Sequence, residues 1–140
     1  MFIGKYYHHL EQNQRISLPK KFRELAQSWV VTRGLDGCLF LFKPETFQAS
    51  IESIANRSLT KKANRDLVRL MTNEATELSS DANGRVHLPE YLIEFAKLTK
   101  NVVIVGSLNK IEIWDQDRYH QYVAQLENQA ETIAESVDVE

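Results

Sequence analysis

The chain contains the same short pattern twice, 70 residues apart, and this repeat constrains the fold more than any other feature. Residues 11–19 read EQNQRISLP, and residues 81–89 read DANGRVHLP. The match continues downstream, where residues 30–42 align with residues 102–114 after a two-residue insertion in the second copy. Each unit is only about 35 residues, too small for a core of its own. The two copies are therefore expected to pack as one pseudo-symmetric domain.

The second copy translates readily into local structure. Asp81 to Gly84 is turn chemistry, because an Asp side chain accepts bonds from backbone amides ahead of it and Gly tolerates positive φ. Residues 85–88 alternate polar and apolar, as in a half-buried strand. Pro89 suits the first turn of a helix, and Gly106 separates two β-rich runs that predict a hairpin. Each unit is read as turn, strand, short helix and hairpin.

Three longer helices are expected outside these units, two between the copies and one at the end. Their expected first residues or caps are Pro44, then Thr60 or Ser58, then Asp115 or Asp117. The last helix carries apolar residues at helical spacing, which indicates packing on the core or on another subunit; they are Tyr119, Val123, Leu126, Ala130 and Ile133. Residues 135–140 are expected to fray.

Composition places the chain among ordinary globular domains, with 140 residues, 43% of them hydrophobic and 26% charged. No apolar run is long enough to span a membrane, and the N-terminus lacks the pattern of a signal peptide. Cys38 is the single cysteine, which excludes an intrachain disulfide and a cysteine zinc cluster. These features predict a cytoplasmic protein.

Charge is distributed unevenly along the chain, although the net charge is only −2. Residues 1–70 hold 12 Lys/Arg and 6 Asp/Glu, whereas residues 71–140 hold 5 and 13. This asymmetry indicates a basic working face on an otherwise acidic protein. Chance clustering together with a solvated acidic tail would give the same counts, so both interpretations stay open.

The paired turns, together with the opening residues 1–4 (MFIG) and the hairpins at residues 30–42 and 103–114, resemble the MraZ family over residues 1–125. The resemblance implies an α+β fold in which two pseudo-symmetric AbrB-like swapped-hairpin repeats form one small β-barrel with flanking helices, assembling into a ring. The implied organisation is a single domain over residues 1–140, divided into a first repeat (5–47), a helical connector (48–74), a second repeat (75–119) and a C-terminal helix and tail (120–140).

The resemblance also implies a function. A protein of this kind is expected to regulate transcription of the bacterial division and cell-wall gene cluster by binding repeated sites in promoter DNA, its own promoter included. The implied partners are double-stranded DNA and further copies of the chain, in the cytoplasm at the nucleoid. No membrane, small-molecule substrate, cofactor or metal is expected.

On this resemblance the family's first arginine falls on Arg15, which is expected to reach DNA from its turn. Nearby lysines would add phosphate contacts; they are Lys5, Lys20 and Lys21. The tip of the turn offers donors and acceptors to base edges, from Asn13 and Gln14.

Arg85 is the counterpart of Arg15 in the second copy, and its role is left between two alternatives. It either contacts DNA or braces its surroundings by pairing with Asp81 or with a neighbouring unit. Arg15 has the same alternative, because an acid and an arginine four residues apart around a turn can form a local salt bridge that braces the turn.

Three positions and one short segment depart from the family pattern, and they bear on base specificity more than on the fold. Ile3 stands where arginine is common, and Glu11 and Gln14 stand where Asp and Gly are commoner. The connector ends at residues 72–76 (TNEAT), where relatives often have Gly-His-Ala.

Two other classes of function are compatible with a chain of this size. An enzyme is disfavoured because none of the usual phosphate-loop, dinucleotide, zinc-protease or serine-hydrolase motifs occurs. Cys38 is read as a buried thiol after a hairpin turn, and His8 and His9 alternate on a strand, which makes joint chelation of a metal difficult. No catalytic or metal residue is assigned.

The second alternative is a protein-interaction or antitoxin-type module, in which the acidic C-terminal helix would bind a protein partner. AbrB-like units also serve as antitoxins. Against this alternative, antitoxins usually carry one unit and a long tail, whereas this chain has two units and a short tail.

Overall fold

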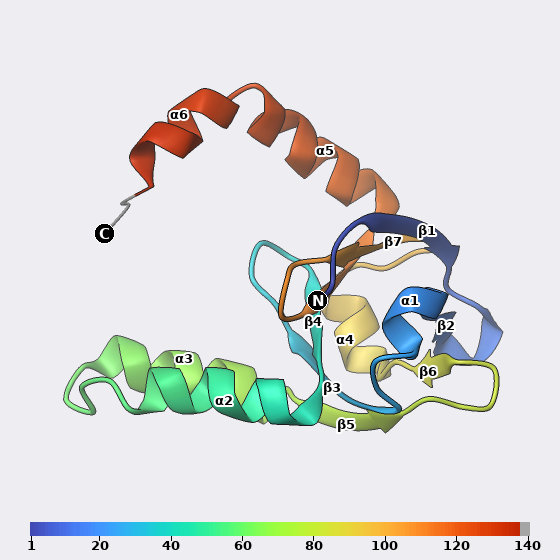
Figure 1. Cartoon of the computed structure of the whole chain (residues 1–140), viewed down its shortest axis with the longest axis horizontal. Helices are drawn as coiled ribbons and strands as arrows, with labels where there is room; N and C mark the ends of the chain where they lie inside the picture. Colours follow the sequence, from blue (N-terminus) through green and yellow to red (C-terminus); the bar gives the residue numbers. More distant parts are fainter. Residues whose placement is uncertain (138–140) are drawn as a thin grey trace.

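A computed structural model describes residues 1–137 as a mixed α+β domain (Figure 1). In chain order the elements are β1 (Lys5–His9), the 3₁₀ turn η1 (Gln12–Gln14), β2 (Arg15–Ser17), α1 (Lys20–Arg23), β3 (Ser28–Arg33), β4 (Leu39–Phe42), α2 (Pro44–Ala55), α3 (Lys62–Asn73), β5 (Thr76–Ser79), β6 (Arg85–His87), α4 (Glu90–Phe95), β7 (Asn101–Gly106), β8 (Ile111–Asp115), α5 (Gln116–Glu127) and α6 (Ala130–Ser136). Each sequence unit therefore contains the turn, strand, short helix and hairpin that its sequence predicts.

The strands form two antiparallel sheets whose order reflects the repeat. The larger sheet runs β1-β7-β8-β4-β3-β5, and β2 pairs with β6 in a separate two-stranded sheet. The outer strand of each unit pairs with the hairpin of the other, β1 with β7 and β5 with β3. The units are thus interleaved, and neither hairpin is complete without a strand from the other copy.

The hydrogen bonds of residues 1–137 do not close a barrel. β1 and β5 remain the two edges of the six-stranded sheet. After β1, and again after β5, the chain enters one of the repeated turns, and the strands that follow these turns, β2 and β6, pair with each other. A single bridge, between Leu10 and Ile16, connects the end of β1 to this two-stranded sheet. The expected barrel is therefore an open sheet with a separate two-stranded sheet.

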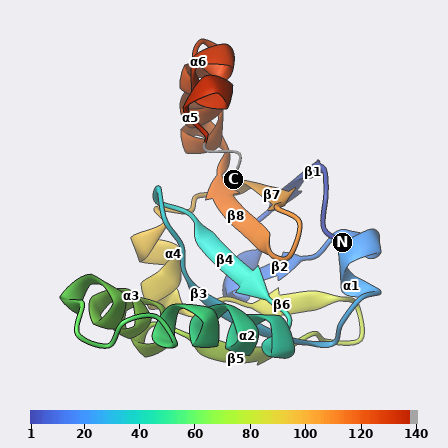
Figure 2. The ribbon, with the colours of Figure 1, turned by 60° about the vertical axis from the view of Figure 1, so that its left-hand side comes forward.

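The main core fills the space between the six-stranded sheet, the two-stranded sheet and the short helices α1 and α4. Trp29, Leu88 and Leu92 are fully buried in it, and the ring of Phe22 packs edge-on against Phe2 at 5.2 Å. The opposite face of the sheet is covered by α2, α3 and the start of α5 over a second cluster (Figure 2), made of Cys38, Phe40, Phe42, Met71 and Trp114. Strands covered on both faces explain the long apolar runs of the two hairpins.

The helix starts agree with the sequence in two cases and differ in one. Helix α2 begins at Pro44, as expected. Asp115 caps α5, where its carboxylate accepts a bond from the amide of Arg118 at 3.3 Å. The expected cap of α3 is wrong, since that helix begins after Lys61 without a side-chain cap. The hydroxyls of Ser58 and Thr60 bond each other instead, at 2.7 Å.

The expected single last helix is broken into α5 and α6 at residues 128–129. Helix α6 continues to Ser136, so fraying from residue 135 is wrong for residues 135 and 136, and residues 138–140 lie outside the described part. Within residues 1–137, no helix is both long enough and apolar enough to cross a membrane.

The Cys38 thiol is buried behind the turn at Asp36 and Gly37, both of which have positive φ. It donates to the carbonyl of Leu35 at 3.3 Å. Burial raises the pKa of this thiol far above its ordinary value. The buried-thiol interpretation is confirmed.

Gly106 is a position where the fold has no room for a side chain. A Cβ there would lie 2.3 Å from the backbone nitrogen of Ile3. We expect Gly106→Ala to lower the free energy of unfolding by about 1–3 kcal/mol, as overpacking does, because the N-terminal segment would have to leave its place beside β7. Urea denaturation measures this effect, and Ser107→Ala is the matched control. Equal stability of the two variants would contradict the close approach.

Candidate functional site

The pairing of β2 with β6 places the two repeated turns side by side. Arg15 lies opposite His87, and Ser17 lies opposite Arg85. The central residues Ile16 and Val86 are fully buried, so the four flanking side chains project from the other side of the two strands. We call this outer side, formed by Arg15, Ser17, Arg85 and His87, the ribbon face.

The backbone of each turn is tied to the other copy. The amide of Leu88 donates to the carbonyl of Gln14 at 2.9 Å, and the amide of Leu18 donates to the carbonyl of Gly84 at 3.2 Å. The two bonds are equivalent under the repeat. They hold the turns in a fixed relation, so residues of the ribbon face are presented together.

Arg85 is braced by acids from both copies. Its Nε donates to Asp81 at 3.0 Å, and its guanidinium reaches Glu11 of the first copy at 3.3 Å. The bond to Asp81 is the main cause that raises the pKa of Arg85. The Asp81 carboxylate also accepts the backbone amides of Arg85 and Asn83, both at 2.9 Å, and these bonds lower the pKa of Asp81. The bracing alternative for Arg85 is what the geometry shows, and its contact with DNA stays a prediction.

Arg15 is in a different situation, although it occupies the equivalent position. It is partly exposed, and within residues 1–137 it makes no ion pair. The local salt bridge to Glu11 does not form, because that carboxylate is engaged by Arg85 and, at 3.4 Å, by the hydroxyl of Ser17. The guanidinium of Arg15 is therefore available to a ligand on the ribbon face.

The expected lysines fall into two places. Lys20 and Lys21 are exposed on α1 and border a surface depression that also includes Ser17 of the ribbon face. Lys5 is on the other side of β1, where its Nζ lies 6.0 Å from the ring of Tyr119 on α5. The structure brings Lys20 and Lys21 to the ribbon, and it does not bring Lys5 there.

Asn13 and Gln14 form the tip of the first turn, with φ of 69° and 62°. Asn13 is exposed and Gln14 is partly exposed. The second copy has Gly84, at φ 74°, in the position of Gln14. The first turn therefore places a non-glycine residue in a left-handed conformation that costs free energy.

Two residues of this region were missed in the sequence. Arg23 crosses from α1 to the second turn, where it donates to the carbonyl of Asn83 at 2.8 Å. His87 lies opposite Arg15 in the ribbon. Arg23 aligns with Ile93 in the second copy, so the repeat does not mark it as a functional residue. The position of His87 opposite Arg15 can be inferred only after β2 and β6 are known to pair.

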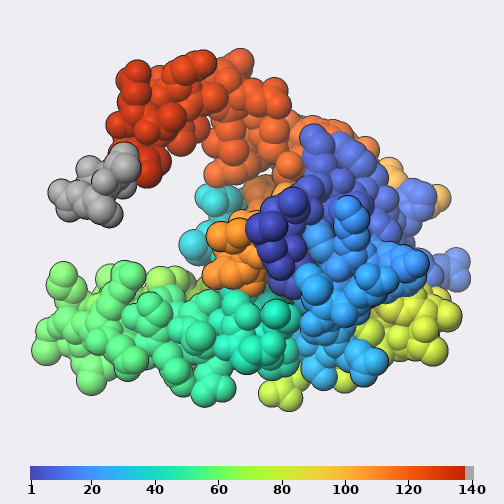
Figure 3. Space-filling model, viewed as in Figure 1, coloured from blue at the N-terminus to red at the C-terminus, as the bar shows by residue number. Residues whose placement is uncertain are grey.

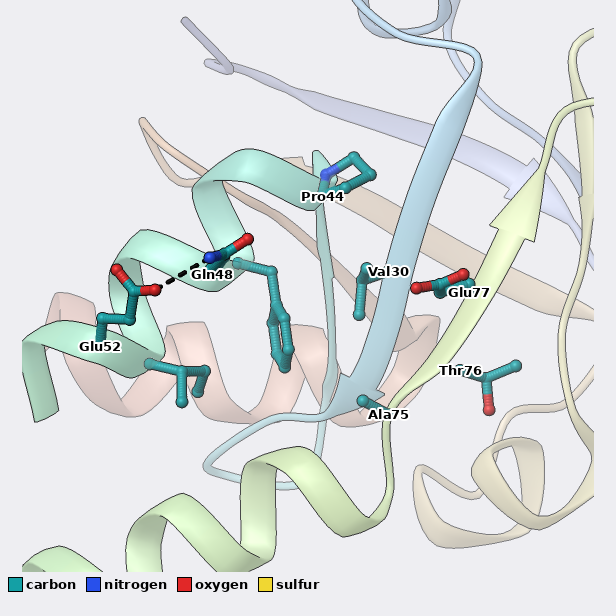
Figure 4. Close-up of a pocket in the computed structure, with 9 residues that line it drawn as sticks. Val30, Pro44, Gln48, Glu52, Ala75, Thr76 and Glu77 are labelled. Carbon is teal, nitrogen blue, oxygen red and sulfur yellow. Dashed lines mark hydrogen bonds between the residues drawn. The ribbon is translucent and has the colours of Figure 1, made fainter. Parts of the chain in front are cut away.

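A second hollow lies between α2 and the strands β3 and β5, with Val30 on its floor (Figure 4). Its rim carries Glu52 and Glu77, and Glu52 accepts a bond from Gln48 at 2.9 Å. These carboxylates disfavour an anionic ligand. Among residues 1–137, no group of three or more His, Cys, Asp or Glu side chains is placed to hold a metal ion.

The sequence matches one family model twice, at residues 1–70 and at residues 71–139. The model is that of the MraZ protein, and its description also likens the family to antitoxins. The chain belongs to the MraZ family. Both matches coincide with the two interleaved units, and the boundary between them falls inside α3.

Curated MraZ relatives cover nearly the whole chain. A protein named transcriptional regulator MraZ from Natranaerobius thermophilus is 38% identical over 138 residues, 98% of this chain and 96% of the relative. Another with the same name, from Ligilactobacillus salivarius, is 40% identical over the same shares. These names support a transcription regulator rather than an enzyme.

The strain at Gln14 leads to a stability prediction. We expect Gln14→Gly to raise the free energy of unfolding by about 1 kcal/mol, because glycine adopts this conformation without steric cost. The reverse change in the other turn, Gly84→Ala, should destabilise, since a Cβ there would lie 2.3 Å from Cδ of Arg23. Urea denaturation of both variants measures the pair of effects, and a loss of stability in Gln14→Gly would contradict the interpretation.

The bonds of Asp81 predict a dependence on pH. Its pKa is lowered in the folded protein, so its contribution is present above the unfolded pKa and is lost as pH falls through the folded value. We expect Asp81→Ala to have a lower Tm than wild type at pH 7, and the difference to shrink towards pH 3. Thermal unfolding across this range is the measurement, with Asp117→Ala as the control. A difference that stays constant with pH would show that the charge is not involved.

Proposed function

We propose that this MraZ-family chain is a sequence-specific DNA-binding transcription regulator whose ribbon face binds promoter DNA. The observation that carries the proposal is the asymmetry of the two arginines: Arg85 is fixed by two acids, and Arg15 beside it has no ion pair within residues 1–137. A two-stranded β-ribbon has the width to enter the major groove of DNA. A braced ribbon also loses little conformational freedom on binding.

Within this proposal the residues take different parts. Arg15 contacts a base edge or a phosphate, and the amides of Asn13 and Gln14 read base edges. Lys20 and Lys21, exposed beside the ribbon, contact phosphates and set the register. Two further residues are secondary. Lys5 adds a phosphate contact only at the margin of the site, and Arg85 chiefly holds the ribbon.

The proposal includes a ring of identical chains that binds repeated promoter sites, the chain's own promoter among them, in the bacterial division and cell-wall gene cluster. Several ribbons presented to several repeats convert modest single contacts into tight binding. An acidic chain can bind DNA at the nucleoid in this way, since only the presented face has to be basic.

An antitoxin-type interaction module is the second candidate. The family description likens MraZ to antitoxins, and the C-terminal helices are acidic. Binding of a protein toxin by these helices, with no binding of the ribbon to DNA, is what this candidate requires.

We expect Arg15→Ala to weaken binding to promoter DNA by roughly tenfold or more at moderate salt if a base contact is lost. Specificity over scrambled DNA would then fall as well. Loss of a phosphate contact would instead weaken both DNAs and lower the salt slope by about one. Fluorescence anisotropy with DNA from upstream of the chain's own gene measures both outcomes.

The matched control is Arg57→Ala, which removes an exposed arginine after α2, and light scattering checks that the assembly is intact. Equal affinity of Arg15→Ala and wild type for promoter DNA would show that the ribbon face is not the DNA-binding site. No preference of wild type for its own promoter would overturn sequence-specific autoregulation.

A further inference from the structure

Helices α5 and α6 form an arm that leaves the body of the protein. The first turns of α5 are anchored, since the rings of Tyr119 and Tyr122 pack on Trp114 at 5.7 and 5.2 Å. Beyond them the arm extends past the sheet, and both ribbon views show α6 standing apart from the other elements (Figures 1 and 2). We call residues 116–136 the arm.

The apolar stripe of the arm continues beyond the part that is anchored. Leu126, near the end of α5, and Ile133, on α6, lie on either side of the break at residues 128–129 and are each 38% exposed. Exposed acids accompany them, Glu127 on α5 and Glu131 and Glu135 on α6. An apolar stripe that starts in the core of its own chain and continues over solvent is typical of a helix that packs on another surface.

A surface with complementary properties lies on the hairpin of helices formed by α2 and α3. A pocket of about 220 Å³ there is lined mainly by apolar atoms of Ala55, Leu59 and Val68, together with Arg65 and Arg69. Leu59 is 72% exposed. The pocket therefore offers an apolar floor to an aliphatic side chain and a basic rim to a carboxylate.

Positive charge is in excess where α2 leads into α3, although α2 itself carries Glu45 and Glu52. Residues 57–69 contain five Lys/Arg and one acid, Asp66. That single carboxylate is already shared by Lys62 and Arg69. Within residues 1–137, the guanidinium of Arg65 donates only to the carbonyl of Leu59, at 2.7 Å. Further carboxylates could pair with these cations.

We propose that the arm of one copy docks on the α2–α3 hairpin of the next copy. Leu126 and Ile133 would cover the apolar pocket, and the three glutamates would face Arg65 and Arg69. In the space-filling view, the arm and the hairpin lie on opposite sides of an open space and do not cover each other (Figure 3). In the proposed contact, the arm of one copy therefore meets the hairpin of the next copy.

Such a contact is heterologous, because the two surfaces that meet are different. Heterologous contacts form rings when the rotation between neighbours closes, and filaments when it does not. The inference rests on the proposed ring and supplies its contact. It also assigns the acidic arm to a second copy of this chain rather than to a foreign protein.

The test uses two charge-reversed variants of the full chain. The arm variant carries Glu127→Lys, Glu131→Lys and Glu135→Lys, and the hairpin variant carries Lys61→Glu, Arg65→Glu and Arg69→Glu. Each variant alone presents like charges at the contact, so light scattering should give a mass near the 16.2 kDa of one chain. In a one-to-one mixture every contact pairs opposite charges again, and the mass should return to that of wild type.

The control is the double variant Glu90→Lys and Glu94→Lys on α4, which reverses exposed acids away from the arm and should leave the mass unchanged. Circular dichroism confirms that each variant is folded. Variants that assemble alone as wild type does would overturn the docking and leave the ring standing. Folded variants that stay monomeric when mixed would overturn it as well.

A wild-type protein that is monomeric at all concentrations would overturn the ring and the docking together. DNA binding is measured separately on the same samples, with a single promoter repeat. A charge-reversed variant that still assembles but no longer binds DNA would contradict the ribbon face as the DNA-binding site. A variant that no longer assembles but still binds a single promoter repeat would support the docking of the arm and leave the ribbon face unaffected.

Discussion

The exchange of edge strands between the two units is the constraint on which the rest of the structure depends. β1 completes the hairpin of the second unit and β5 completes that of the first, so neither unit has a full sheet alone. The exchange brings the two chain segments that leave β1 and β5 to the same place. β2 and β6 can then pair, and the ribbon face follows from that pairing.

The two turns occupy equivalent positions in the repeat, but their side chains form different interactions. This difference leaves one arginine paired and the other unpaired within residues 1–137. Glu11 and Asp81 occupy equivalent positions, yet both bind Arg85. Arg15 is left without an acid within residues 1–137 as a direct consequence. The backbone shows the same division, since Gly84 accepts the left-handed conformation easily and Gln14 does not. One turn acts as the brace, and the other carries the exposed polar groups.

The sequence predicts what depends on local pattern or on the repeat, and it fails where the units meet. Alternation and turn residues predict both ribbon strands. Helix patterning narrows the cap of the last helix to Asp115 or Asp117, of which the structure uses Asp115. The pairing of Glu11 with Arg85, 74 positions away, rather than with the nearby Arg15 depends on how the two turns meet in space, and no periodicity in the sequence encodes it. The interruption of the last helix at residues 128–129 likewise has no Gly or Pro to mark it.

The fold separates the basic residues of the N-terminal half into different parts of the surface. Of the 12 cations in residues 1–70, five lie between residues 57 and 69 on the α2–α3 hairpin, and Figure 1 places that hairpin on the opposite side of the molecule from β2 and β6. Arg33 is also elsewhere, stacked on Phe95 at 4.4 Å. A single basic face is therefore too simple an interpretation. Under the two proposals, the cations near the ribbon would bind a polyanion and those on the hairpin would bind the carboxylates of the arm. The cations of residues 1–70 would then belong to two surfaces.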